Sequence, residues 1–261
     1  MIVITLASMK GGVGKTTNSI LIANNLAARG FKVLYFELDI QNNSATTYYT
    51  KGIENINTEI LKKNNFQAFT DGTILPYVVP TTVKNIDIIP NSPKMKKLNP
   101  YGANDLKKAF QTVESNYDYI VVDTSPYYNM ITLNALSAAD IILTPVQFTD
   151  WDVTTLESLQ ESIFDDCPQK VNDWYIFYSD WQSAHEKFET SVQSQFADYF
   201  EEHYKNIIDV KIPRVSAAVK YTQTGELLST TSAKDGNRKL AEAVNRMVDM
   251  ITGVENPAER F

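Results

Sequence analysis

The sequence predicts an α/β fold, a mostly parallel twisted sheet with helices on both faces, and three observations support it. Short apolar runs that read as buried strands alternate with stretches of helical periodicity along the chain. The 261 residues, 43% of them hydrophobic, suffice for an α/β domain with a sizeable core. No internal repeat or low-complexity linker marks a boundary. We therefore expect residues 1–261 to form a single domain.

Six apolar runs are expected to form the strands. The first begins at Ile2, and the second ends at Leu38, where acidic residues follow. The six runs span residues 2–7, 31–38, 83–90, 117–122, 140–145 and 174–178.

Helical spacing of apolar residues fills most of the gaps between these runs. The predicted helices span residues 18–29, 104–114, 154–164, 190–203 and 234–251, and Gly30 is expected to stop the first of them. Residues 46–82 are less periodic and rich in Asn, Thr and Tyr. We expect that region to be irregular or to form short helices over one edge of the site described next.

The composition excludes several classes of site. A single cysteine, Cys167, rules out a disulfide framework or a cysteine-ligated cluster within one chain. The two histidines, His185 and His203, lack the spacing of a metal site. A net charge of −7 argues against a strongly basic nucleic-acid-binding protein but leaves a local basic patch open.

The first residues enter a strand directly, without a basic segment or a cleavage site, and no apolar run approaches the length of a membrane span. The sequence therefore predicts a cytoplasmic protein.

The segment Lys10 to Thr17 follows the first predicted strand and precedes a helix. In this context a glycine-rich turn and a helix N-terminus can surround phosphate oxygens with backbone N–H groups. Lys15 is placed to meet the β- and γ-phosphates, and the Thr16 hydroxyl can bind Mg²⁺. The predicted nucleotide-binding residues of this loop are Gly11, Gly12, Val13, Gly14, Lys15, Thr16 and Thr17.

The loop departs from the usual phosphate-binding pattern in an informative way. The first glycine of G-x-x-x-x-G-K-[ST] is missing, and Lys10 stands inside the loop. A dinucleotide-binding turn is not favoured, because the third glycine of that motif is absent. The remaining alternative is a glycine-rich turn with solvated lysines.

The pattern K-G-G-x-G-K-[ST] resembles the deviant P-loop of the ParA/MinD family of ATPases. The resemblance covers nearly the whole chain, from Ile2 to about Ile251. It implies a deviant P-loop NTPase that uses ATP and Mg²⁺ and forms a homodimer with ATP. It also implies that Lys10 reaches the nucleotide of the other subunit, as an arginine finger acts in trans.

Acidic residues end two of the predicted strands. Glu37 and Asp39 follow one strand, and Asp123 follows the apolar residues 119–122. The carboxyl ends of strands collect ligand groups in open α/β sheets, so all three are expected beside the phosphates. Asp123 reads as a Walker B carboxylate that holds the coordination waters of Mg²⁺.

The segment from Glu37 to Gln41 resembles the D-x-D-P-Q element of the same family, with Glu37 and Ile40 as departures. The resemblance implies that Asp39 positions or activates the attacking water and that Glu37 supports Mg²⁺ through its water shell. Lys10, Lys15 and Asp39 are thus the predicted catalytic residues, and Thr16, Glu37 and Asp123 the predicted metal site. An Asp39 that merely caps a turn is the alternative.

The segment Ile212 to Arg214 resembles the loop that covers the base in this family, which makes Pro213 and Arg214 candidates for adenine contact. A plain turn after a strand is the alternative for Pro213. No N-K-x-D tetrapeptide occurs, which favours ATP over GTP.

Two features separate the branches of the family. The last residues lack the basic amphipathic helix that would lie on a membrane, so no membrane partner is expected. ParA-type relatives hold DNA without sequence preference through phosphate contacts. No helix-turn-helix precedes the P-loop, so sequence-specific binding is not expected. The basic residues of the C-terminal half that could contact DNA phosphates are Lys187, Lys205, Lys211, Lys220, Lys234, Arg238, Lys239 and Arg246.

A solvated charged face is the alternative for these basic residues, because acidic residues are interleaved and the second arginine of P-R-x-x-R is missing after Arg214. The resemblance implies an ATPase for plasmid or chromosome partition, which would be nucleoid-associated while ATP-bound dimers hold DNA. Its hydrolysis would be weak until a ParB-like partner and DNA stimulate it. The alternatives are an ATPase that positions a protein assembly and a nucleotide-gated binding module with little hydrolysis.

Overall fold

The computed structural model describes residues 1–40, 44–100, 102–181, 192–213 and 235–253. These residues form an eight-stranded sheet in the order β3-β4-β2-β5-β1-β6-β7-β8. All described strand pairs are parallel except β3 with β4. The strands are β1 (Ile2–Leu6), β2 (Val33–Leu38), β3 (Val79–Pro80), β4 (Ile86–Ile89), β5 (Tyr119–Thr124), β6 (Ile141–Val146), β7 (Trp174–Trp181) and β8 (Ile207–Pro213). The predicted fold class is confirmed.

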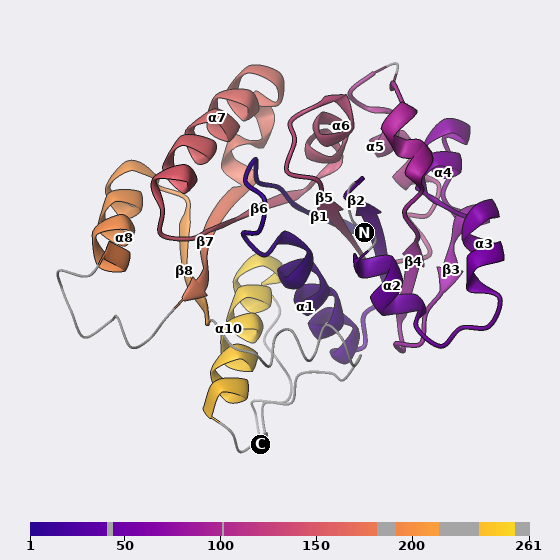
Figure 1. Ribbon diagram of the computed structural model, residues 1–261, viewed down its shortest axis with the longest axis horizontal. Helices are drawn as coiled ribbons and strands as arrows, with labels where there is room; N and C mark the ends of the chain where they lie inside the picture. The colour runs from indigo at the N-terminus through magenta and orange to yellow at the C-terminus, as the bar shows by residue number, and fades with distance from the viewer. Residues whose placement is uncertain (41–43, 101, 182–191, 214–234, 254–261) are drawn as a thin grey trace.

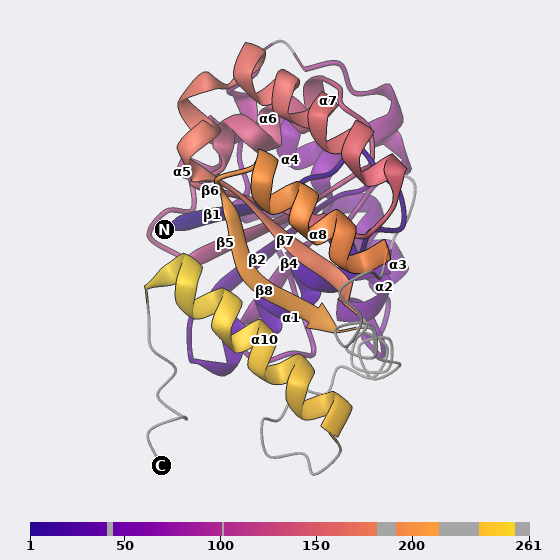
Figure 2. The ribbon, with the colours of Figure 1, turned by 90° about the vertical axis from the view of Figure 1, so that its left-hand side faces the viewer.

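Helices cover both faces of the sheet (Figures 1 and 2). The described helices are α1 (Lys15–Ala28), α2 (Ser44–Thr50), α3 (Ile56–Lys62), α4 (Asn65–Asp71), α5 (Asp105–Gln111), α6 (Met130–Ala138), α7 (Asp150–Asp166), α8 (Val192–His203) and α10 (Asp235–Thr252). Three short 3-10 helices accompany them, η1 (Leu75–Tyr77), η2 (Pro93–Lys97) and η3 (Pro168–Asp173).

Three clusters of buried apolar side chains define the layers. On one face of the sheet, α1, α2 and α10 pack together over β1, β2 and β5. On the other face, α4, α5 and α6 form a second cluster, and α6, α7 and α8 form a third over β6 and β7. Figure 2 shows α4 to α7 above the sheet and α1 and α10 below it.

The register of the central strands aligns the residues that matter for the site. Leu6 of β1 and Glu37 of β2 are both paired with Asp123 of β5. The parallel sheet therefore brings the ends of these three strands to one edge, where the turn between β1 and α1 also lies.

The structure differs from the sequence prediction mainly in the short elements. Residues 46–82 contain most of α2 and all of α3, α4 and η1, so the expectation of short helices holds there. The structure also contains α6 and β8, which were not predicted as elements. Helix α7 begins four residues before its predicted start, because Thr149 and Asp152 form a capping box.

Helix α10 attaches the C-terminal part of the described chain to α1. Its residues Leu240, Val244 and Met247 are buried in the same cluster as α1. Arg29, which follows α1, forms an ion pair with Asp249 of α10. Among the described helices, none has both the length and the apolar character that a membrane crossing requires.

Candidate nucleotide-binding site

The turn between β1 and α1 has the backbone conformation of a phosphate-binding loop. Gly12 and Gly14 have φ angles of +77° and +94°, in the region that favours glycine. A Cβ at Gly14 would also lie 3.0 Å from Asn18 Nδ2 and from Ser179 Oγ. Gly14 directly precedes the first turn of α1, so the loop ends at the N-terminus of that helix, which carries the positive end of the helix dipole.

A cavity of about 420 Å³ opens on this loop. It brings together most of the residues that the sequence predicted, and it excludes Val13, whose side chain is 1% exposed and packs in the interior. The lining residues are Gly11, Gly12, Gly14, Lys15, Thr16, Thr17, Asp39 and Pro126.

Lys15 lies across the base of the loop. Its Nζ donates a hydrogen bond to the carbonyl oxygen of Lys10, at 2.9 Å, and the residue is only 7% exposed. Burial lowers its pKa, and the charges of Asp123 and Asp39 oppose that shift. The ammonium is thus held in an enclosed position where a phosphate charge would stabilise it.

Asp123 is a fully buried carboxylate at the end of β5. Neither of its oxygens accepts a hydrogen bond from the residues that the structure describes. Burial raises its pKa to about 7, while the nearby Thr16 hydroxyl and the Lys15 ammonium oppose that shift. An unpaired buried carboxylate is costly, so its presence needs an explanation, and the waters around a bound Mg²⁺ supply one.

Glu37 is used differently from the sequence expectation. Its Oε1 accepts a hydrogen bond from Ala45 N at 3.0 Å, and its Oε2 accepts from Thr46 N at 2.9 Å and from the Thr46 hydroxyl. The carboxylate therefore binds the first turn of α2, and Glu37 does not line the cavity. This placement does not favour a role in supporting Mg²⁺.

Asp39 lies where the sequence predicted it. It lines the cavity and is 6% exposed. Its backbone carbonyl accepts a hydrogen bond from Asn91 Nδ2 at 2.7 Å. Asp39 thus brings a carboxylate from the end of β2 to the same space as the loop.

Lys10 contacts side chains of its own chain. Its Nζ forms an ion pair with Asp152 at 2.7 Å and donates to Thr149 Oγ1 at 3.0 Å and Gln147 Oε1 at 3.4 Å. Asp152 also accepts from Gln147 N and Thr149 N, because it closes the capping box of α7. Lys10 is thus attached to the start of α7.

The predicted adenine contacts of Pro213 and Arg214 stay a prediction. Pro213 is the last residue of β8, aligned with Trp181 of β7, and not part of a plain turn. Arg214 lies outside the described residues, as do Lys187, Lys220 and Lys234.

Several other basic residues of the C-terminal half have partners. Arg238 pairs with Glu242, Arg246 pairs with Asp209, and Lys211 lies over the Trp181 ring at 4.3 Å.

Several residues that contact the phosphate-binding loop were not predicted from the sequence. Gln147 Nε2 donates to Gly12 O at 3.3 Å, and Asn18 Nδ2 donates to Ser179 Oγ at 3.1 Å. Asp152 holds Lys10. Gln147 directly follows β6 and Ser179 lies near the end of β7, so the rule that ligand groups gather at strand ends could have found these two.

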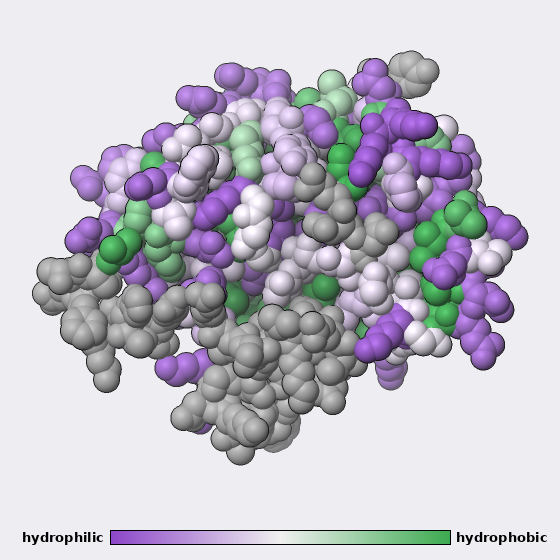
Figure 3. Space-filling view, viewed as in Figure 1, coloured by the Kyte–Doolittle hydropathy of each residue, from purple (hydrophilic) through white to green (hydrophobic). Residues whose placement is uncertain are grey.

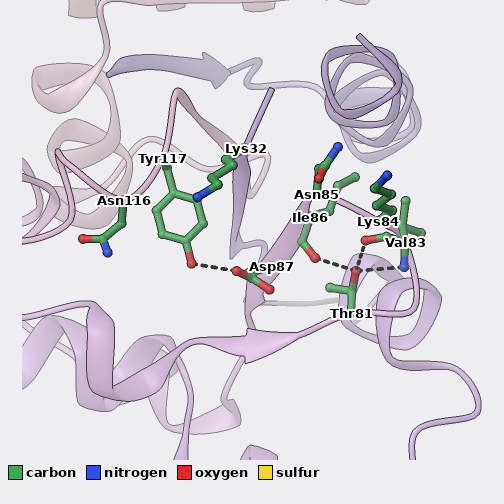
Figure 4. A pocket seen from close by; sticks show the side chains of 9 residues that line it. All are labelled: Lys32, Thr81, Val83, Lys84, Asn85, Ile86, Asp87, Asn116 and Tyr117. Carbon is green, nitrogen blue, oxygen red and sulfur yellow. Dashed lines mark hydrogen bonds between the residues drawn. The ribbon is translucent and has the colours of Figure 1, made fainter. Parts of the chain in front are cut away.

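A second cavity, of about 440 Å³, lies near the amino-terminal ends of β2, β4 and β5, away from the loop (Figure 4). Lys32 and Lys84 lie at this cavity. The Tyr117 hydroxyl donates to Asp87 at 2.9 Å, and the Thr81 hydroxyl bonds to the backbone of residues 83 and 86. The Tyr117 and Thr81 hydroxyls are satisfied within the chain and no glycine lines this cavity, so we assign the nucleotide to the first cavity.

Comparison with known proteins agrees with this geometry. Residues 1–173 match a protein family described as an AAA domain. The chain is 32% identical over 167 residues to the sporulation initiation inhibitor protein Soj of Bacillus subtilis, a match that covers 62% of this chain and 64% of Soj. It thus spans somewhat under two thirds of that relative.

Solved structures share the fold over nearly the full length. A plasmid partition protein of Borrelia burgdorferi, solved with bound AMPPNP, has a TM-score of 0.76 at 21% identity, covering 97% of this chain and 99% of its own. The apo McdA structure from Cyanothece has a TM-score of 0.75 at 21% identity, covering 94% of this chain and 98% of its own.

Proposed function

This chain belongs to the ParA/MinD family of P-loop ATPases, and from that premise we propose that it is a ParA-type ATPase for the partition of a plasmid or chromosome. The observation that carries the proposal is the enclosure of Lys15, Asp39 and the loop glycines around one cavity, with the unpaired carboxylate of Asp123 nearby. A triphosphate and a divalent cation would satisfy these groups together. We favour DNA partition over the positioning of a protein assembly, because the relatives include proteins named for chromosome partitioning.

Each residue has a distinct part in holding ATP. The loop amides and the Lys15 ammonium bind the phosphate oxygens, and the Thr16 hydroxyl and Asp123 would hold Mg²⁺. When bound, Mg²⁺ neutralises charge on the phosphates. The Asp123 oxygens already lack a donor among the described residues, so binding would need little rearrangement of β5.

Hydrolysis transfers a phosphoryl group to water, and the chain contributes mainly position and charge. Asp39 lines the cavity beside the loop, where its carboxylate can orient the attacking water by accepting a hydrogen bond from it. Lys15 stabilises the negative charge that spreads over the transferred group.

Lys10 acts in the dimer in this proposal. Two ATP-bound subunits would face each other, with Lys10 of each completing the site of the other. In the structure the Lys10 ammonium contacts Asp152, so dimerisation would exchange this contact for one with a phosphate. The ATP-bound dimer would hold DNA, and a ParB-like partner would stimulate hydrolysis and release it.

Two substitutions test the assignment. Lys15→Ala should abolish ATP binding, because it removes the enclosed cation. Asp39→Ala should bind ATP but hydrolyse it at least about tenfold more slowly and accumulate ATP-bound dimers. Equilibrium binding, phosphate release and sedimentation measure these outcomes.

Lys84→Ala is the control, because Lys84 lies at the other cavity. Wild-type turnover by Asp39→Ala would remove Asp39 from the mechanism. Failure of the wild type to bind ATP would overturn the whole proposal.

A further inference from the structure

Two buried asparagines hold the end of β2, the strand that leads to Asp39. Asn91, two residues beyond β4, donates from Nδ2 to Asp39 O at 2.7 Å. Asn65, the first residue of α4, donates from Nδ2 to Glu37 O at 2.7 Å. The two carbonyl groups thus receive side-chain donors from different elements.

The two asparagine side chains also fix each other. Asn65 Nδ2 donates to Asn91 Oδ1 at 2.9 Å. Ser92 N donates to Oδ1 of both Asn65 and Asn91, at 2.9 Å each. Both amide oxygens therefore accept from a backbone N–H, which sets the orientation of each amide and directs its nitrogen toward β2.

Glu37 and Thr46 connect the same network to α2. The Thr46 hydroxyl accepts a hydrogen bond from Asn91 N at 2.9 Å and donates to the Glu37 carboxylate. Asn65, Asn91 and Glu37 are at most 2% exposed. Water is therefore a poor substitute for any of these partners.

We propose that Asn91 is a positioning residue for hydrolysis, which acts by fixing the peptide of Asp39. The proposal rests on the function assigned to Asp39 above. An aspartate carboxylate is separated from its backbone by two rotatable bonds, so the orientation of the peptide determines which part of the cavity the carboxylate reaches. Small displacements of a catalytic group cost large factors in rate.

The donor of Asn91 is the feature that matters. A carboxylate in its place would keep the volume and the acceptor for Ser92 N but would direct an oxygen at Asp39 O. Two acceptors in contact repel. Asn91→Asp therefore keeps the volume and the acceptor while it replaces the amide donor with a charged acceptor, whereas Asn91→Ala removes the whole amide.

Asn134 provides a matched control. It is also fully buried and donates from Nδ2 to Gly102 O at 2.7 Å and to Met130 O at 2.9 Å. Its Oδ1 accepts from Leu106 N at 3.1 Å. These contacts join α5 and α6 and do not touch β2, so Asn134→Ala measures what losing a buried amide does to stability alone.

The test is single-turnover hydrolysis with separately measured ATP affinity. Asn91→Ala and Asn91→Asp should each slow hydrolysis about tenfold or more, while ATP affinity stays within about threefold of the wild type. Asn134→Ala should lower the midpoint of thermal unfolding about as much as Asn91→Ala does. Its hydrolysis rate should stay within about twofold of the wild-type rate. In an Asp39→Ala background, Asn91→Ala should cause no further loss, because the residue it positions is gone.

The outcomes separate this inference from the function. Unchanged hydrolysis in the folded Asn91→Asp variant overturns the inference, as does an additional loss in the Asp39→Ala background. If Asp39→Ala alone hydrolyses ATP at the wild-type rate, the assignment of Asp39 fails instead. Should Asn91→Ala not fold, Asn91→Asp still decides the question, because it retains the acceptor of Ser92 N.

Discussion

At the scale of single residues, the ion pair between Lys10 and Asp152 competes with the proposed dimer. The pair is 18% exposed at Lys10 and 2% exposed at Asp152, and it must break before Lys10 can reach another subunit. Replacing Asp152 with Asn removes the charge but keeps an acceptor for the backbone of Gln147. We expect Asp152→Asn to dimerise in the presence of ATP at an about fivefold lower protein concentration than the wild type. This corresponds to a change of about 1 kcal/mol in the free energy of dimerisation. Sedimentation at several protein concentrations measures this.

Asp150→Asn is the control, since Asp150 also lies in the first turn of α7 but is exposed and makes no ion pair with a described residue. If both variants dimerise like the wild type, the Lys10 contact within the chain does not oppose dimerisation.

Glu37 should make stability depend on pH. Burial raises its pKa from about 4.5 to about 8. Between these values the folded chain keeps a proton that the unfolded chain loses, so the free energy of unfolding decreases as pH rises. The decrease is at most about 1.4 kcal/mol per pH unit. Glu37→Gln removes this titration, so its stability relative to the wild type should increase from about pH 5 to about pH 8 and then level off.

Urea unfolding across this range tests the titration, with Glu54→Gln as an exposed control. A constant difference between Glu37→Gln and the wild type at every pH would show that Glu37 does not titrate there.

The residues of the site differ in how far the sequence could predict them. Lys15, Asp39 and Asp123 follow from a local pattern, because the loop and the strand ends determine where they lie. The partner of Glu37 does not, because it depends on where α2 returns to the sheet. For the same reason, the sequence could not show that Lys10 contacts α7 or that Asn91 contacts Asp39.

At the scale of elements, the phosphate-binding loop should respond in a graded way to added methyl groups. Gly11 has no positive φ, and no atom lies within 4 Å of the place that its Cβ would take, so Gly11→Ala should leave stability nearly unchanged. Gly12→Ala adds backbone strain of about 1 kcal/mol. Gly14→Ala adds strain and two contacts at 3.0 Å, so it should destabilise most. Thermal unfolding of the three variants measures the order.

ATP affinity provides the second readout for this series, and it should fall most for Gly14→Ala. Equal thermal midpoints for Gly12→Ala and Gly14→Ala would show that the crowding at Asn18 and Ser179 relaxes without cost.

Most of the elements that the sequence predicted are long and regular, although the seven-residue α5 and the four-residue β4 were predicted too. The central strands are continuous apolar runs because helices cover both of their faces, and α10 has a clear polar side. The missed helix α6 is buried around most of its circumference, so its apolar residues show no periodicity. The seven-residue helices α2, α3 and α4 complete about two turns each, which is too short for a periodic signal.

At the scale of the whole molecule, unpaired basic charge is found outside the C-terminal half as well as within it, where Lys205 and Lys239 are exposed and make no ion pair with a described residue. Exposed lysines at η2 and at the start of α5 make no ion pair with any described residue, whereas Arg238 and Arg246 of α10 are paired. Hydrophilic side chains predominate over α4 and α5 in Figure 3. The lysines concerned are Lys94, Lys96, Lys97, Lys107 and Lys108.

We therefore expect the η2 and α5 lysines to contribute more to any DNA affinity than Arg238 and Arg246 of α10. Lys96→Glu combined with Lys97→Glu should weaken ATP-dependent DNA retention. The slope of the logarithm of DNA affinity against the logarithm of salt concentration should fall in magnitude by about one unit per lysine. Lys62→Glu combined with Lys63→Glu at α3 changes the net charge equally and is the control. An equal loss in both pairs would mean that net charge and not a surface controls retention, and no retention by the wild type would remove DNA from the proposed function.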